Sequence, residues 1–393
     1  MRLLVLSFYY PPDLCAGSFR ISPLVRVLRT VLREGSQIDV VTTLPNRYRT
    51  FSVDASETEI EEGLRIRRVA LPLHQSGMWD QSKAFLAYAR GVRAHVSGQR
   101  FDAVFATSSR LMSAVLGASI ARRQRVPLYL DIRDIFVDTV GDILPVWVAR
   151  PLASVFSVLE RYAIGSARKV NLVSRGFEPY FRMRYPGKPL SFFPNGIDDE
   201  FIGASSPFSA NPGVPPYRVL YAGNLGEGQG LHMILPGLAR AMQGRARFTV
   251  IGDGGRREQL RRALDEAGVD NVTLRSPISR SELVEEYRQS DVLFLHLNDH
   301  DAFRKVLPSK LFEYASLGKP IWAGVAGYAA DFVKNEIENA AVFPPCDVDA
   351  AAAAFSTLRM QAIRRDAFVR KYARDVIMQA MARDIAETLE ARS

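Results

Sequence analysis

The segment RVLYAGNLGEGQGLHMILPGLARAM, residues 218–242, decides the predicted fold. It opens with a short, mostly apolar run, RVLYA, which is typical of a buried strand. Four glycines follow within the eight residues 223–230, and apolar side chains then recur at helical spacing. A strand, a glycine-rich turn and a helix in this order predict parallel βαβ units and therefore an α/β fold.

The same alternation extends in both directions from this segment. Toward the C-terminus we expect strands at residues 247–251, 273–275, 292–296 and 320–323, and helices at 256–267, 281–289 and 361–391. Toward the N-terminus we expect strands at residues 2–8, 38–42, 64–70, 103–106, 127–131 and 169–173, and a helix at 21–33. Two successive doubly wound sheets predict a ligand cleft between two domains, at the carboxyl ends of the strands.

One stretch without periodicity separates the two halves. Residues 201–217, FIGASSPFSANPGVPPY, are rich in Ser, Gly and Pro and are interpreted as a linker. We therefore expect an N-terminal domain at residues 1–200 and a C-terminal domain at residues 218–370. Residues 371–393 are expected to form a helix that packs back on the N-terminal domain.

Composition restricts the class of protein. The chain has 393 residues and no apolar run of the roughly 18–20 residues that a membrane span requires. Its opening is interpreted as a buried strand, because aromatic residues and prolines follow too soon for a signal peptide. Two cysteines, Cys15 and Cys346, match no metal-ligand spacing and predict reduced thiols in a cytosolic protein. The net charge of +9 predicts an anionic partner, while no motif points to nucleic acid.

Three glycine-containing loops, at residues 9–20, 221–230 and 251–255, each follow a predicted strand. Glycine lets the backbone approach a ligand closely, and the first N–H groups of a following helix form an anion site. Ordinary turns are the alternative. In that reading Gly17 is a turn residue, and Asp253 accepts a hydrogen bond from the neighbouring backbone.

The segment VLPSKLFEYASLGKPI, residues 306–321, predicts a helix that begins at Lys310 with Ser309 as its N-cap. Glu313 lies one turn after Lys310, on nearly the same face. A lysine at this place can pair with phosphate, and the carboxylate can accept hydrogen bonds from a ribose diol. The alternative is a surface ion pair between the two side chains.

The segment YLDIRDIF, residues 129–136, places Asp131, Arg133 and Asp134 just beyond a predicted strand end. An open sheet binds its ligands at that edge. The alternative is an internal salt bridge that fixes the loop.

In their order and spacing these segments resemble the family-4 retaining glycosyltransferases of the GT-B fold. The similar members are bacterial enzymes, amino-sugar transferases among them, that build O-antigen and other lipopolysaccharide glycans, capsule and exopolysaccharide. The segments that carry the resemblance are YYPPD with Gly17 and Arg20, DIRD, LERYAIGSARKVNLVSRG (159–176), FFPNGID (192–198), YAGNLGEGQGL, VIGDG and PSKLFEYASLGKPI. The resemblance implies two Rossmann-like domains whose parallel sheets face a central cleft.

The resemblance also implies which residues contact the donor phosphates. Gly17 approaches the diphosphate from the N-terminal domain, and Gly223 and Asn224 line it from the C-terminal domain. Ser309 and Lys310 face the phosphates or the transferred sugar.

Other residues are implied to hold the nucleoside. Gly252 and Asp253 lie near the nucleotide, Pro277 and Ile278 offer backbone groups to the base, and Glu313 binds the ribose hydroxyls.

The implied reaction is hexosyl transfer from a nucleoside diphosphate sugar to an acceptor hydroxyl, with retention of configuration. In the family's front-face route the leaving phosphate takes the acceptor proton, and we expect no metal or other cofactor. Lys310 would stabilise charge on the diphosphate, and Asp131 or Asp134 would orient the acceptor. Arg20 and Leu311 complete the expected donor site.

The resemblance extends to the partners. The first expectation for the donor is a UDP-linked, N-acetylated sugar, and for the acceptor a polyprenyl-diphosphate-linked glycan. Arg26, Arg29 and Arg33 recur at helical spacing, and another basic region spans residues 161–188. They predict a cytoplasmic enzyme attached peripherally to the anionic inner leaflet of the plasma membrane, a solvated basic face being the alternative.

Two departures from the family pattern stand out. Many members carry two glutamates separated by seven residues, but the first position here is Lys305. Many also carry an Arg and a Lys that clamp the diphosphate, where this chain offers Asn224 and Gln229. Lys310, Lys305 or Arg304 would then supply the missing charge. The alternative functions are a non-catalytic subunit that binds nucleotide sugar or acts as a scaffold, and a GT-B nucleotide-sugar epimerase.

Overall fold

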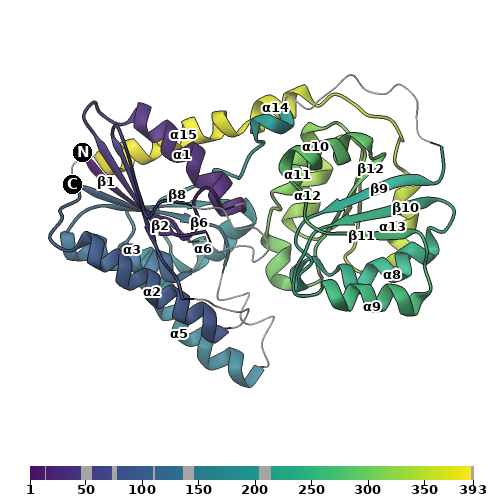
Figure 1. The fold of residues 1–393 in the computed structure, drawn as a ribbon, viewed down its shortest axis with the longest axis horizontal. Helices are drawn as coiled ribbons and strands as arrows, with labels where there is room; N and C mark the ends of the chain where they lie inside the picture. Colours follow the sequence, from purple (N-terminus) through teal and green to yellow (C-terminus); the bar gives the residue numbers. More distant parts are fainter. Residues whose placement is uncertain are drawn as a thin grey trace. The chain divides into compact units, whose positions relative to one another are not determined.

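The computed structural model describes residues 1–13, 15–45, 55–72, 78–108, 111–135, 146–202 and 214–390. The chain divides into two compact units (Figure 1). The first unit comprises Met1–Asn195 and Ile377–Ser393, and the second comprises Gly196–Val376. Most of the expected linker, residues 203–213, lies outside the described residues.

The first unit is built on an eight-stranded sheet of order β3-β4-β2-β1-β5-β6-β7-β8. Its strands are β1 (Arg2–Leu6), β2 (Gln37–Thr43), β3 (Thr58–Glu61), β4 (Leu64–Val69), β5 (Ala103–Thr107), β6 (Leu128–Ile132), β7 (Lys169–Leu172) and β8 (Leu190–Ser191). All neighbours pair in parallel except β3, which runs antiparallel to β4. The sequence pattern predicted parallel strands alone, so this edge strand is a correction.

Helices cover both faces of this sheet, with α2, α3 and α5 on one face and α1 and α15 on the other (Figure 1). Their bounds are α1 (Ala16–Val31), α2 (Met78–Val96), α3 (Leu111–Gln124), α5 (Val146–Ser166), α6 (Glu178–Arg184) and α15 (Arg374–Glu390). None of the helices in the described ranges is long and apolar enough to cross a membrane.

The second unit is built on a six-stranded parallel sheet of order β11-β10-β9-β12-β13-β14. Its strands are β9 (Tyr217–Ala222), β10 (Ala246–Ile251), β11 (Val272–Arg275), β12 (Val292–His296), β13 (Ile321–Gly324) and β14 (Ala340–Phe343). Its helices are α7 (Asp199–Ile202), α8 (Leu231–Ala241), α9 (Arg257–Ala267), α10 (Arg280–Gln289), α11 (Lys310–Ser316), α12 (Tyr328–Glu336), α13 (Val348–Phe355) and α14 (Asp366–Tyr372).

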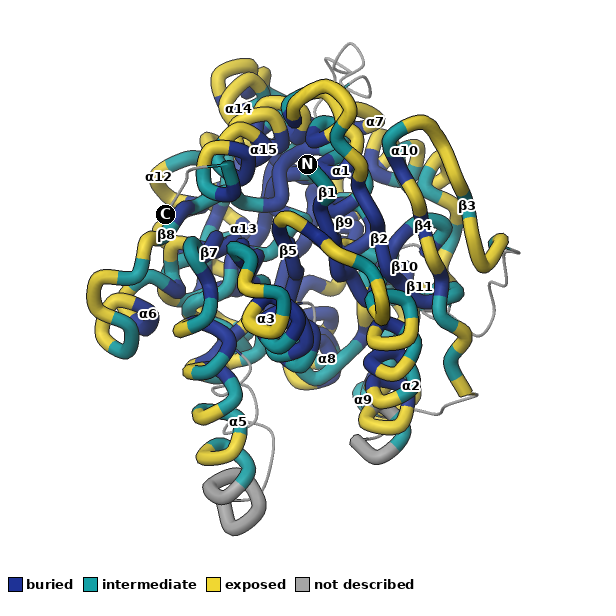
Figure 2. The backbone as a smooth tube through the Cα atoms, turned by 90° about the vertical axis from the view of Figure 1, so that its left-hand side faces the viewer, coloured by how far each residue is buried: buried dark blue, intermediate teal, exposed yellow. Residues whose placement is uncertain are grey.

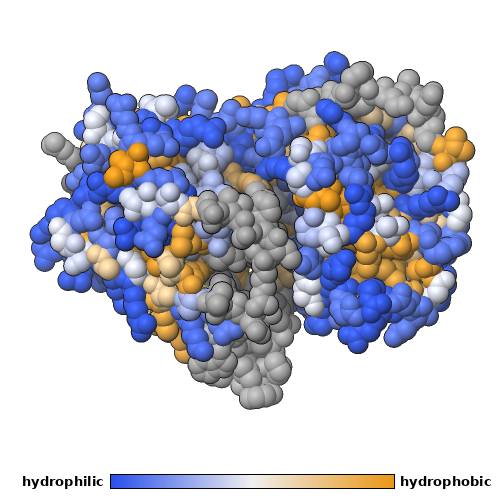
Figure 3. Space-filling view, viewed as in Figure 1, coloured by the Kyte–Doolittle hydropathy of each residue, from blue (hydrophilic) through white to orange (hydrophobic). Residues whose placement is uncertain are grey.

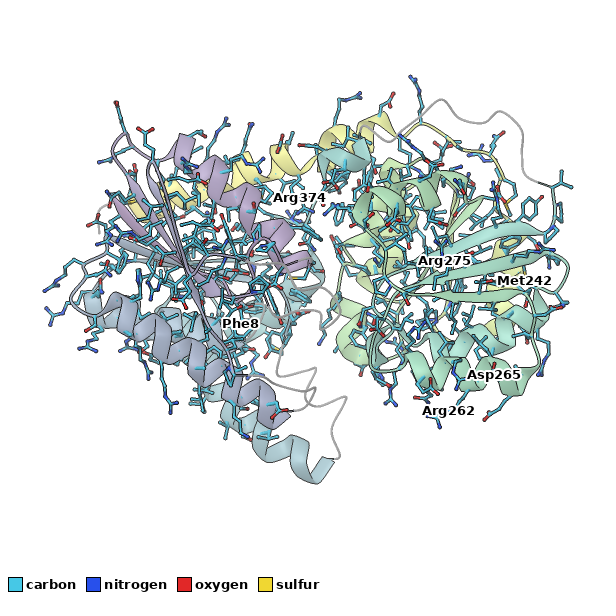
Figure 4. The ribbon with its side chains drawn as sticks, viewed as in Figure 1. Phe8, Met242, Arg262, Asp265, Arg275 and Arg374 are labelled. Atoms are coloured by element: carbon cyan, nitrogen blue, oxygen red, sulfur yellow. The ribbon has the colours of Figure 1, made fainter. Side chains whose placement is uncertain are left out.

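The core of the second unit lies between the sheet and α8, α9 and α13. Met242, at the end of α8, is fully buried there among aromatic residues of the strands, while Arg262 and Asp265 lie on the outer side of α9 (Figure 4). Figure 2 shows the same pattern in both units, with buried strands and exposed outer faces on the helices. The strands therefore hold the loops at their carboxyl ends in fixed positions.

The C-terminal region forms two helices where the sequence predicted one. Residues 361–365 are not helical, and α14 and α15 are separated at Ala373, which pairs with Ile197 in an isolated parallel bridge. Met378, Met381 and Ile385 of α15 are fully buried. Residues 377–390 therefore contribute to the core of the first unit.

Candidate functional site

Two glycine-rich loops of the second unit pack backbone against backbone. The N–H of Gly223 donates to the Ile251 carbonyl at 2.8 Å, and the N–H of Leu225 donates to the Asp253 carbonyl at 2.9 Å. A Cβ atom on Gly252 would lie 1.8 Å from the Gly223 carbonyl oxygen. Real Cβ atoms do not approach so closely, so the crossing of these loops requires glycine at residue 252.

Side chains fix the shape of the first of these loops. The Asn224 amide donates to Gln229 Oε1 at 2.8 Å, and the same oxygen accepts from the N–H of Gly226 at 3.3 Å. The Tyr221 hydroxyl donates to the Asn224 carbonyl at 2.7 Å. The two residues that stand where many family members have a cationic clamp are therefore bonded to each other and hold the loop.

His296, which the sequence analysis did not single out, lies at the end of β12 and contacts the β9–α8 loop. Its Nε2 accepts from the N–H of Cys346 at 2.9 Å, so Nδ1 carries the proton and donates to the Gln229 carbonyl at 2.7 Å. Burial lowers the pKa of His296 to about 4, with the bond to Gln229 opposing this. The ring is therefore a neutral structural link, and its place at the end of β12 was the only signal.

Lys310 brings a positive charge to these loops. A Cβ atom on Gly223 would lie 2.3 Å from Lys310 Cε and 2.7 Å from Nζ, so the ammonium group lies directly against the glycine backbone. Burial lowers the pKa of Lys310, and the nearby Glu313 carboxylate opposes that shift. A half-buried cation beside a glycine-rich loop is suited to a phosphate group.

The start of α11 differs in part from the prediction. The helix begins at Lys310 as expected, but Ser309 has helical backbone angles of −59° and −31° and its side chain makes no cap. Leu311 is fully buried. The expected N-cap at Ser309 is therefore wrong, and Leu311 contributes packing here instead of a side-chain contact to a donor.

Glu313 lies one turn further along α11 and is half-buried. Its Oε2 lies 3.5 Å from the hydroxyl of Tyr287, whose ring packs edge-to-face on Tyr314 at 5.4 Å. Burial raises the pKa of Glu313, and Lys310 and Arg280 oppose that shift. The carboxylate keeps free acceptor positions that two vicinal hydroxyls could fill.

A network of charged side chains borders Glu313. Arg280 pairs with Asp198 and Glu200, and Arg374 pairs with Asp198 as well. The sequence comparison included Asp198 only as the end of the FFPNGID segment. Because these charges are mutually paired, the network holds the start of the second unit against α10.

Three further predicted residues lie at strand ends of the second unit. Asp253 is exposed, and its Oδ1 accepts from the N–H of Gly254 at 2.8 Å, which is the turn role weighed as the alternative. Pro277 and Ile278 lie in the coil between β11 and α10, at the carboxyl edge of the sheet. Their position is compatible with backbone contacts to a ligand.

In the first unit, Arg20 and Asp131 form a buried ion pair. Arg20 Nε and Nη2 each donate to the Asp131 carboxylate at 2.9 Å, and both residues are 1% exposed. Asn171 donates to the same carboxylate at 2.7 Å, and Arg20 also donates to the carbonyls of Phe193 and Pro194. The pair is thus an internal salt bridge, as the alternative for this segment predicted, although its partner Arg20 lies outside the segment, and both side chains are bonded to other protein groups.

The sequence analysis named Arg133 beside Asp131 and Asp134 but assigned it no role in the site. A Cβ atom on Gly17 would lie 3.2 Å from Arg133 Nη1, a buried atom that has no hydrogen-bond partner among the residues that the structure describes. Gly17 lies in the first turn of α1, whose N–H groups also attract anions. Asp134, next along the chain, is exposed and remains the aspartate of this segment that a ligand can reach.

Two family models match consecutive parts of the chain. Residues 21–196 match the glycosyl transferase 4-like domain, and residues 206–375 match glycosyl transferases group 1. The chain is a glycosyltransferase. The predicted enzyme class, of the hexosyltransferase type, is confirmed. No curated protein is similar enough in sequence to be matched.

Solved structures share the fold of this glycosyltransferase at low sequence identity. Sucrose-phosphate synthase from Thermosynechococcus elongatus gives a TM-score of 0.69 at 16% identity, over 99% of this chain and 94% of that one. WaaG, a glycosyltransferase involved in lipopolysaccharide biosynthesis, gives 0.62 at 14%, over 99% and 96%. HepE from Anabaena, solved in complex with UDP, gives 0.59 at 16%, over 99% and 95%. The predicted GT-B fold is therefore confirmed.

Proposed function

We propose that this glycosyltransferase transfers a sugar from a nucleoside diphosphate sugar, UDP-linked in the first instance, with retention of configuration. The observation that carries the proposal is the position of Lys310, whose ammonium group lies against Gly223 where two glycine-rich loops cross. A half-buried cation at this position stabilises the charge that develops on a leaving diphosphate. Glu313, one turn along α11, would accept hydrogen bonds from the ribose.

The second unit offers Lys310 to the diphosphate. In the first unit Arg133 lies beside Gly17, and within the described residues its buried Nη1 has no hydrogen-bond partner, so it is a further cation suited to an anionic group. In the proposed front-face route the leaving phosphate takes the acceptor proton, so these groups hold charge and supply no base. Exposed Asp134 is assigned to orienting the acceptor hydroxyl.

The Lys310→Ala variant tests the donor site. Loss of a charge-assisted contact should weaken UDP binding, measured by calorimetry, about tenfold or more and slow sugar transfer at least as much. Lys334→Ala, which removes an exposed lysine of α12, is the matched control and should leave both unchanged. Unaltered binding and turnover in Lys310→Ala would overturn the assignment.

The proposed acceptor is a polyprenyl-diphosphate-linked glycan at an anionic membrane surface, as in bacterial surface polysaccharide synthesis. Two of the arginines expected to face that surface are paired within the protein: Arg29 with Glu61 and Arg33 with Glu390. Val155 and Val158 on α5 are instead 55% and 64% exposed, beside exposed Arg161. The face shown in Figure 3 is mostly polar, with separate apolar areas between the polar residues. This face of α5 combines apolar and cationic groups and is assigned to the membrane.

Flotation with vesicles tests this attachment. The wild-type enzyme should float with vesicles rich in anionic phospholipid at low salt. A double variant with Val155→Glu and Val158→Glu should no longer float with these vesicles. Val376→Glu, at a 52% exposed position on α15, is the control. Absence of wild-type binding, or equal binding by all three proteins, contradicts the assignment.

A further inference from the structure

A cavity of about 450 Å³ lies between α2 and β4 in the first unit. Its lining includes Arg67, Val69, Gly91, His95 and Ser97. None of these residues belongs to the glycine-rich loops, to α11 or to the segment around Arg133. The cavity is therefore separate from the candidate donor site.

The close approach of α2 to β4 shows which side chains face this cavity. A Cβ atom on Gly91 would lie 2.6 Å from both methyl groups of Val69, so the Val69 face of the strand looks toward α2. Side chains alternate along a strand, which places Arg65 and Arg67 on that same face. Arg68 lies on the opposite face, where it donates to the Pro11 carbonyl at 2.9 Å.

Two groups in the lining have hydrogen-bonding capacity left over. Arg67 is exposed and donates to Thr58 Oγ1 at 3.0 Å, and among the described residues that is its one acceptor. His95 Nε2 is buried and has no partner in the part of the chain that the structure describes. A buried imidazole nitrogen without a partner is costly unless a ligand or water completes it.

The charge balance around the cavity is positive. Asp39, on the neighbouring strand β2, is already paired with Arg2 at 2.6 Å and lies 3.9 Å from Arg65. Among the lining residues, Glu57 is the one acid. The guanidinium fork of Arg67 is suited to bidentate contacts with phosphate or carboxylate oxygens.

We propose that this cavity is a second binding site, for a small anionic sugar. Its volume lies within the range of small-molecule sites. Arg67 would bind the anionic group, and His95 Nε2 and the Ser97 hydroxyl would bond the sugar hydroxyls. The anionic group is a phosphate or a carboxylate, two sources that share this chemistry.

Calorimetry on the full-length protein, saturated with UDP, tests the proposal with four probes: glucose 6-phosphate, glucuronate, glucose and inorganic phosphate. Glucose 6-phosphate or glucuronate should bind, and whichever binds more tightly identifies the anionic group. Glucose alone and phosphate alone should bind at least about tenfold more weakly than that probe. Because the readout is binding at a separate cavity, it stands whether or not the enzyme transfers sugar.

Three variants locate the binding. Arg67→Gln and His95→Gln should each weaken binding of the anionic sugar, Arg67→Gln by about tenfold or more. Arg90→Gln removes an exposed charge from α2 outside the cavity lining and should have no effect. Thermal unfolding shows whether each variant is folded. If Arg67→Gln does not fold, the affinity of His95→Gln for the anionic sugar tests the proposal. No binding of either anionic sugar, phosphate binding as tightly as the anionic sugar, or wild-type affinity in both lining variants overturns the proposal.

Discussion

Two pairs of opposite charges, one in each unit, differ in how completely the protein itself satisfies them. Arg20 and Asp131 face each other at 2.9 Å and use their remaining positions on other protein groups. Lys310 and Glu313 lie one turn apart. The Tyr287 hydroxyl is 3.5 Å from Oε2 of Glu313, which is a long hydrogen bond. A fully satisfied buried pair stabilises a fold, whereas a half-buried pair with spare capacity is a site for ligand.

Replacing Asp131 with Asn should therefore cost stability. The change leaves Arg20 buried without its counter-charge, and the expected loss is about 3–5 kcal/mol in the free energy of unfolding, measured with urea. Asp265→Asn, which alters a 64% exposed carboxylate on the outer side of α9 (Figure 4), should leave stability unchanged. An Asp131→Asn enzyme of full stability but without turnover would instead assign Asp131 to the acceptor.

At the scale of elements, the donor loops depend on backbone crossings that side chains cannot replace. Three backbone hydrogen bonds link the β9–α8 loop to the β10–α9 loop, and His296 of β12 bonds the first of these loops at Gln229. The regular strands beneath fix where the loops begin, and glycine fixes how closely they meet. A change in one loop is therefore transmitted to the other.

Gly252→Ala tests this coupling. The added Cβ would lie 1.8 Å from the Gly223 carbonyl oxygen, so both loops must move, at an expected cost of about 1–3 kcal/mol. Because Gly223 touches Lys310, UDP binding should weaken in parallel. Gly255→Ala is the matched control, since a Cβ there meets nothing within 4 Å. Equal UDP affinity in the two variants would show that the crossing is dispensable.

Much of this architecture follows from the sequence for a simple reason. Alternating apolar strands and helices are local signals, so β12 has its predicted bounds and α11 begins at the predicted Lys310. The role of Asp131 depends on Arg20 and Asn171, which are distant in sequence. The local sequence pattern therefore could not predict that the Asp131 carboxylate is buried. The separation of α14 from α15 at Ala373 could not be predicted for the same reason, because Ala373 pairs with Ile197, which is distant in sequence.

On the scale of the whole molecule, residues 377–390 belong to the same unit as residues 1–195. Residues 377–390 bury Met378, Met381 and Ile385 in the first unit, and Asp384 bonds the Tyr129 hydroxyl at 2.7 Å. Met381 also touches the internal ion pair, with its Sδ 3.3 Å from Arg20 Nη2. The last helix is thus part of the first core.

Met381→Ala should destabilise the first unit. Removal of a fully buried methionine leaves a cavity, with an expected loss of about 2–5 kcal/mol, and limited proteolysis should cut residues 1–195 before 196–376. Met183→Ala is the control, because that side chain is 77% exposed. If both variants unfold at the wild-type urea concentration, α15 is not an integral part of this core.

The return of the last helix to the first unit also bears on how the chain is made. During translation, residues 1–195 leave the ribosome before residues 196–376, but they lack the helix that completes their core until the second unit has been synthesised. The second unit, continuous from Gly196 to Val376, has all its strands before that moment. Of the two units, the one whose strands are synthesised first is therefore the one whose core is completed last, and until then its exposed apolar surface favours aggregation.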